Sequence, residues 1–135
     1  MGKFTALSSD IYSIFGTEAW TAEGITARPE NFVAINNLSE FIRINIIPGS
    51  SGINLNSVSG LLLIEIFIPA GKGTKRAFQI ADILDTHLVG KSVSTVQGAV
   101  VQFGKSTCAP NGKDKEDDNL YVYEYNTPFN YFGVN

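Results

Sequence analysis

The segment from Gly71 to Thr74 is the part of the sequence that comes nearest to a known chemical motif. Its residues, Gly-Lys-Gly-Thr, stand between an apolar stretch and a helix-like pattern, which is where nucleotide-binding proteins carry a phosphate-binding loop. That motif needs another glycine upstream and a Ser or Thr directly after the lysine. Here Gly73 follows Lys72, and strand-like residues occupy the upstream positions, so we do not predict a nucleotide site. A looser anion site at the start of the helix stays open.

The other reactive side chains lack partners in the sequence. His87 is the only histidine, and its neighbour Asp85 points elsewhere because residues i and i+2 diverge on a helix. Cys108 is the only cysteine, which excludes an internal disulfide framework and a multi-cysteine metal site. No pair of carboxylates stands out for acid–base catalysis. We therefore predict no catalytic residue, no metal site, no cofactor and no enzyme activity.

Three tyrosines alternate near the end of the chain and could stack the bases of a single strand. Such a surface needs interleaved basic residues, but Glu124 stands among Tyr121, Tyr123 and Tyr125. The net charge of −3 also disfavours nucleic acid as a partner. We interpret the tyrosines as a sheet face that lies under a helix or against another subunit.

The elements that would position these residues centre on the apolar run Leu61–Ile68. Both faces of this run are apolar except at Glu65, which predicts a central strand covered on both sides. A helix follows it, with Thr74 as a side-chain N-cap and Gly90 as the C-terminal stop. The helix is predicted from apolar residues at helical spacing: Ala77, Ile80, Ala81, Leu84 and Leu88.

The remaining segments complete a small α+β domain. An N-terminal helix carries the stripe Phe4, Leu7, Ile11, Ile14 and Phe15, and an irregular arm occupies about 20–38. Further strands are expected at 40–47, 93–103 and 120–126, with a long polar loop at about 104–118. We predict a single domain spanning 1–135, with a mainly antiparallel sheet of about four strands and two helices packed on one face.

Composition narrows the functional class. Only 17% of the residues are charged, against about 25% in an average soluble domain, so part of the surface is a candidate for burial against other subunits. A surface rich in Ser, Thr, Asn and Gly explains the low charge equally well. The longest apolar run is too short to span a membrane, and polar residues near the N-terminus argue against a secretory signal.

The order of elements and several local patterns resemble the lambda-type tail terminator family of long-tailed bacteriophages, which cap a finished tail tube. The resemblance covers nearly the whole chain. Its marks are residues 29–32 in the arm, the strand Phe41-Ile42-Arg43-Ile44, the strand 60–67 followed by Pro69 and the glycine turn, and a final strand that ends near Thr127-Pro128-Phe129. These are patterns of residue class and order rather than a catalytic motif.

This resemblance implies a structural virion protein of the tail and neck region, assembled in the host cytoplasm. It implies a homo-hexameric ring without a catalytic site that ends tube polymerisation and offers a surface for head–tail joining. The implied partners are other copies of the chain, the tail tube protein and a head-completion or connector protein. DNA would pass through the lumen without sequence-specific binding, and no membrane is involved. Two alternatives remain, namely another neck or tail-tube virion subunit and a cellular α+β module that binds a small molecule.

Two charge clusters suggest how such a ring would close. A ring needs two different surfaces on each subunit, because its contacts are heterologous. We predict that an acidic loop of one protomer reaches a basic turn of the next; the alternative is that both are solvated surface charges. The basic residues are Lys72, Lys75 and Arg76, and the acidic residues are Asp114, Glu116, Asp117 and Asp118.

Overall fold

A computed structural model describes residues 3–29, 40–51, 57–69, 74–93, 99–113 and 120–133 of the chain. Within these ranges there are three α-helices, α1 (Lys3–Ile14), α2 (Glu18–Thr21) and α3 (Lys75–Leu88). The strands are β1 (Ala27–Pro29), β2 (Phe41–Ser51), β3 (Val58–Pro69), β4 (Ser92–Val93), β5 (Val100–Phe103), β6 (Thr107–Lys113) and β7 (Leu120–Phe132).

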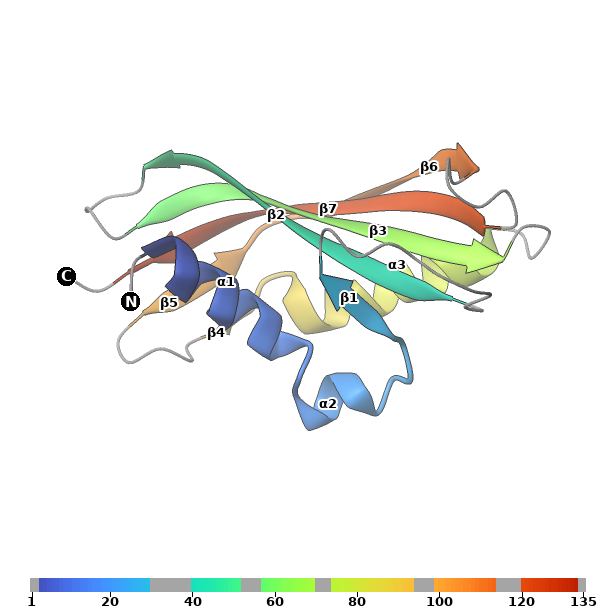
Figure 1. Cartoon of the computed structure of the whole chain (residues 1–135), viewed down its shortest axis with the longest axis horizontal. Helices are drawn as coiled ribbons and strands as arrows, with labels where there is room; N and C mark the ends of the chain where they lie inside the picture. Colours follow the sequence, from blue (N-terminus) through green and yellow to red (C-terminus); the bar gives the residue numbers. More distant parts are fainter. Residues whose placement is uncertain are drawn as a thin grey trace.

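All of these strands belong to one seven-stranded sheet in the order β1-β2-β3-β7-β5-β4, and β6 also pairs with β7. Strand β1 runs parallel to β2, whereas the other pairs are antiparallel, so the sheet is mixed. The sheet curls strongly into a half barrel, and the three helices lie on its inner side (Figure 1).

The expectation of about four strands with two helices is therefore wrong. One added strand, β6, forms inside the segment 104–118 that was expected to be a polar loop. Strand β7 is long, and β5 pairs only with its last residues, Phe129–Phe132. The first half of the same edge needs hydrogen-bond partners, and β6 supplies them between Thr107 and Lys113. Similarly, β1 forms within the arm that was expected to be irregular, and α2 extends into its first residues.

The predicted central strand is confirmed, because β3 pairs with β2 on one side and with β7 on the other. Its inner face carries Leu62, Ile64, Ile66 and Ile68, each at most 2% exposed. Burial of these four side chains contributes about 6–12 kcal/mol before chain entropy is counted. The inner face packs with Leu7 and Ile11 of α1 and with Ile80 and Leu84 of α3 in the main core.

The outer face of the sheet carries a second, smaller core. Phe41 of β2 and Phe67 of β3 stack with ring centroids 4.4 Å apart, and both are 1% exposed. Leu120 and Val122 of β7 complete this cluster. Strand β3 is thus buried on both faces at this end, as the apolar run predicted.

The two ends of α3 differ in how well the sequence predicted them. Gly90 follows the helix with a φ of 72°, a conformation that suits glycine, so the predicted stop is confirmed. The predicted side-chain cap is wrong, because Thr74 has helical backbone angles and its hydroxyl makes no capping hydrogen bond. Its carbonyl accepts from the Phe78 N–H at 3.1 Å instead. Among the described residues, no helix has the length and apolarity needed to cross a membrane.

Candidate functional site

The basic residues predicted at an interface separate into different environments. Lys75 begins α3 and is exposed. Arg76 instead forms an ion pair with Glu40 of its own chain. Its Nε donates to Oε1 at 2.9 Å, and its Nη2 donates to Oε2 at 2.6 Å. The hydrogen bonds to Glu40 raise the pKa of the already cationic Arg76 further. Lys72 and the acidic residues, namely Asp114, Glu116, Asp117 and Asp118, lie outside the described residues, so the contact between the two clusters stays a prediction.

His87 joins two helical regions. Its Nε2 lies 2.9 Å from Oε2 of Glu23, just beyond α2, and the imidazole side chain is 14% exposed. Trp20 of α2 meets the imidazole edge-on with ring centroids 5.2 Å apart. Across the described ranges, no group of three or more His, Cys, Asp and Glu side chains is placed to hold a metal ion. The arrangement around His87 fastens the end of α3 to α2.

A polar cluster that the sequence analysis missed lies between α3, β6 and β7. Oδ1 of Asp85 accepts from the hydroxyl of Tyr125 at 2.7 Å and from that of Ser106 at 2.5 Å. Burial, followed by the hydrogen bond to Asp85, raises the pKa of Tyr125. The alternating tyrosines were the available signal, because a buried tyrosine hydroxyl usually finds a polar partner.

The hydrogen bonds of this cluster connect α3 to the sheet. Burial, then the charges of Asp85 and Asp82, raise the pKa of the Cys108 thiol, so it stays protonated and weakly nucleophilic near neutral pH. A carboxylate is too weak a base to take the proton of Ser106 by itself, and the only imidazole of the chain, on His87, is bound to Glu23. Asp85 therefore ties α3 to the strands beneath it.

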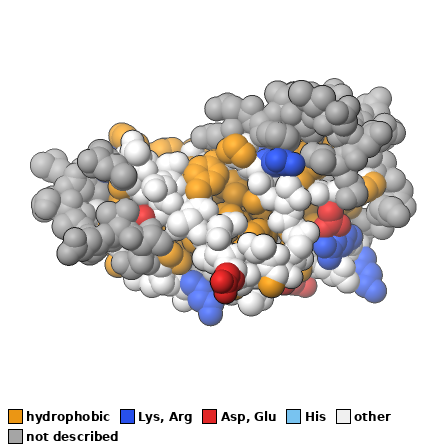
Figure 2. All heavy atoms as spheres, turned by 60° about the horizontal axis from the view of Figure 1, so that its bottom comes forward, with side chains coloured by type: hydrophobic (Ala, Val, Ile, Leu, Met, Phe, Trp, Pro, Cys, Tyr) orange, Lys and Arg blue, Asp and Glu red, His pale blue; other side chains and the backbone are white. Residues whose placement is uncertain are grey.

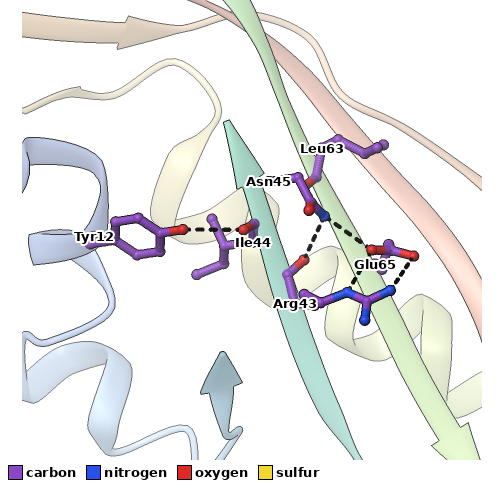
Figure 3. A network of polar contacts seen from close by, with 6 residues as sticks. All are labelled: Tyr12, Arg43, Ile44, Asn45, Leu63 and Glu65. Atoms are coloured by element: carbon purple, nitrogen blue, oxygen red, sulfur yellow. Dashed lines mark hydrogen bonds and ion pairs between the residues drawn. The ribbon is translucent and has the colours of Figure 1, made fainter. Parts of the chain in front are cut away.

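Figure 3 shows a second polar network, which crosses β2 and β3 on the outer face of the sheet. Arg43 donates to Glu65 through two nitrogens, Nε at 2.8 Å and Nη2 at 3.0 Å, and Asn45 donates to the same carboxylate at 3.1 Å. The guanidinium also lies 4.9 Å from the centroid of the Phe67 ring. This network explains why Glu65 interrupts an apolar strand without a large penalty, since its charge is paired directly across the register.

The remaining feature is apolar surface at the two ends of the molecule. The large hydrophobic side chains that are exposed among the described residues are Phe4 (58%), Ile47 (45%) and Phe78 (43%). The start of α1, with Phe4, and the start of α3, with Phe78, lie toward opposite ends of the long axis (Figure 1). Figure 2 shows that charged side chains are sparse over the helical side and that hydrophobic ones reach its surface.

A groove opens beside Phe4. It has a volume of about 290 Å³ and lies between α1 and β2, lined by Phe4, Leu7, Ser8, Ile46 and Pro48. The Lys3 ammonium lies 5.2 Å from the centroid of the Phe4 ring, so a positive charge stands beside a mostly apolar depression. Phe4 belongs to the apolar stripe that the sequence shows in the first helix, but unlike Leu7 and Ile11 it is exposed.

Comparisons with known proteins establish the fold but no function. No protein-family model and no curated protein matches the chain. A solved structure whose description states no activity aligns with 97% of this chain and 94% of its own, with a TM-score of 0.62 and 13% sequence identity. At that identity the likeness extends to the fold alone.

Proposed function

We propose that this chain is a structural subunit of a phage tail that assembles into a homo-hexameric ring, caps the tail tube and presents a surface for head–tail joining. The sequence patterns of 41–44 and 60–67, which form the paired centre of the sheet, resemble tail terminators. The observation that carries the proposal is the exposed apolar surface at both ends of the subunit, with Phe4 toward one end and Phe78 toward the other. Such surfaces favour head-to-tail assembly.

The proposal has a direct test in solution. Light scattering during size-exclusion chromatography measures the mass of the purified protein across a concentration series, and electron microscopy identifies closed rings. We expect a six-subunit species, and we expect added protein to arrest the growth of tail tubes polymerising from purified tube protein. Tubes that continue to lengthen in its presence would contradict a terminator role.

The same measurements separate the alternatives. A tail-tube subunit would form open stacks or filaments rather than isolated rings. A small-molecule-binding module would remain monomeric or dimeric and leave tubes unaffected. The groove beside Phe4, at about 290 Å³, is at the small end of the roughly 300–1,000 Å³ range of ligand pockets. The hydroxyl of Ser8 is the one polar side-chain group among its lining residues, so the groove gives little support to a small-molecule-binding module.

A further inference from the structure

We infer that the groove beside Phe4 receives the Phe78 side chain of a second copy of this chain, with Lys3 of the first copy facing Asp82 of the second. This inference rests on the ring proposed above and assigns its subunit contact. It replaces the contact predicted from the two charge clusters with one built on described residues.

The receiving surface is formed by the first turns of α1 against β2. Leu7 is 1% exposed and forms the floor, while Phe4 stands beside it with more than half of its surface exposed. The other lining residues are Ile46, Pro48 and Ser8, so the groove contains no charged side chain. Its volume of about 290 Å³ accommodates one aromatic ring. The Lys3 ammonium lies beside it, 5.2 Å from the centroid of the Phe4 ring.

The inserting surface is the exposed side of α3 that carries Phe78 and Asp82. Phe78 is exposed, but its orientation is fixed because its ring meets Tyr123 edge-on, with centroids 5.8 Å apart. An anchor whose position is set before binding loses little conformational entropy on docking. Asp82 lies four residues further along the helix, on the same side, and is exposed. The surface thus presents an aromatic ring followed by a carboxylate.

Charge complementarity selects a second copy as the occupant. A benzyl group with a nearby carboxylate matches an apolar groove with a nearby ammonium. Among the described residues, Arg43, Arg76 and His87 form ion pairs with carboxylates, whereas Lys3 and Asp82 do not take part in an ion pair. Both charges are therefore available to a partner copy.

The positions of the two surfaces fit the head-to-tail contacts of the proposed ring rather than a twofold dimer. The start of α1 and the start of α3 lie toward opposite ends of the subunit (Figure 1). Each subunit can then insert its Phe78 into one neighbour and receive that of the other neighbour, which is a heterologous contact.

The first test compares two exposed hydrophobic residues in the full chain. Phe78→Ser should raise the protein concentration needed for ring assembly at least ~10-fold, the change expected when a buried aromatic anchor is removed. Ile47→Ser is the matched control, because Ile47 is equally exposed at 45% but does not line the groove, and it should leave assembly unchanged. Equal effects of the two changes would overturn the assignment.

The second test uses the charges and does not depend on the Phe78 variant folding. Lys3→Glu and Asp82→Lys should each weaken the ring, and the double reversal should recover part of the loss. Rings that assemble normally in both single variants, or a double variant no better than either, would show that these surfaces do not meet while leaving the ring itself intact. Absence of any ring in the wild-type protein would instead refute the proposed function together with this contact.

Discussion

At the level of single residues, the outer face of the sheet shows how a charged residue is kept in an apolar strand. Glu65 is paired with Arg43 on the neighbouring strand β2 and faces Glu124 on the other neighbour, β7. The pair is partly buried, with side-chain exposures of 22% for Arg43 and 20% for Glu65. A carboxylate directly opposite another is unfavourable, so the two glutamates make opposite contributions to stability.

Because Glu65 is paired with Arg43 and Glu124 faces another carboxylate, the same substitution at the two positions should have different effects on stability. Glu65→Gln should lower the free energy of unfolding by about 1–2 kcal/mol, because it weakens two charge-assisted hydrogen bonds from Arg43 and one from Asn45. Glu124→Gln should be neutral or slightly stabilising, because it removes a like charge from the same row. Urea unfolding at pH 7 measures both, and a larger loss for Glu124→Gln would contradict this account.

Tyr131 should make the protein sensitive to alkaline pH. Burial, followed by the nearby Asp10 charge and the hydrogen bond to Asp10, raises the pKa of Tyr131 to about 12, against about 10 in an unfolded chain. The folded state therefore holds this proton more tightly than the unfolded state does. The resulting stabilisation is complete below pH ~10 and is lost as the pH rises to ~12.

The readout is the difference in stability between the wild type and Tyr131→Phe. The variant loses the hydrogen bond to Asp10 but cannot ionise at this position. We expect the urea midpoints of the two proteins to converge between pH ~10 and ~12, whereas general alkaline effects would move both together. A constant gap over this range would show that Tyr131 keeps an ordinary pKa.

At the level of elements, the sequence predicts those with a regular apolar pattern, but it does not predict how the edges of the sheet are paired. The apolar run of β3, the strand at 40–47 and the spacing of α3 all followed from the sequence, because each buries a face with a regular pattern. Strand β6 contains Pro110 and Gly112 and has a register shift between them, so its sequence carries no alternating signal. It forms because β7 leaves an edge to be covered, a fact that exists only in the assembled sheet.

The turn end of the β2–β3 hairpin depends on close backbone approach at Gly60. A Cβ added there would lie 2.3 Å from the Ile47 carbonyl oxygen and 2.9 Å from the Phe129 ring. Gly60→Ala should therefore force the strands apart and lower the free energy of unfolding by about 1–3 kcal/mol, the usual cost of overpacking.

Gly16 provides the control for this prediction. A Cβ at Gly16 would lie 3.6 Å from its nearest neighbour, the Ser13 carbonyl oxygen, which is ordinary contact. Gly16→Ala should change stability little or raise it slightly by restricting the unfolded chain. Urea unfolding compares the two variants, and equal stabilities would mean that the strands tolerate a side chain at Gly60.

At the level of the whole molecule, the half barrel leaves apolar side chains at its two ends, and the sequence did not locate them. Phe4 belongs to the apolar stripe of α1, yet the core covers Leu7 and Ile11 and stops short of Phe4. Arg76 was assigned to an interface from its charge alone, but Glu40 of the same chain already binds it. The exposure of Phe4 and the partner of Arg76 both depend on tertiary packing, which cannot be predicted from residue type and spacing.

Two models of the subunit contact now make opposite predictions about salt. A contact between the acidic residues 114–118 and the basic turn would depend on several partly exposed charges, and assembly would weaken as ionic strength rises. A contact that seats Phe78 in the groove depends mainly on apolar burial, with one ion pair at its margin. Raising NaCl from about 0.1 M to about 1 M shortens the screening length from ~10 Å to ~3 Å, yet should leave the mass of the ring nearly unchanged.

Lys75→Glu sharpens this comparison, because Lys75 is exposed and belongs only to the charge-cluster model. Its reversal should not weaken assembly if Phe78 and Asp82 form the contact, since Lys75 lies one turn before Phe78 and a carboxylate there adds to the negative charge that faces Lys3. It should impair assembly if the acidic residues 114–118 dock at the start of α3. Rings that dissociate in salt and fail with Lys75→Glu would therefore restore the charge-cluster contact and exclude the groove as the subunit interface.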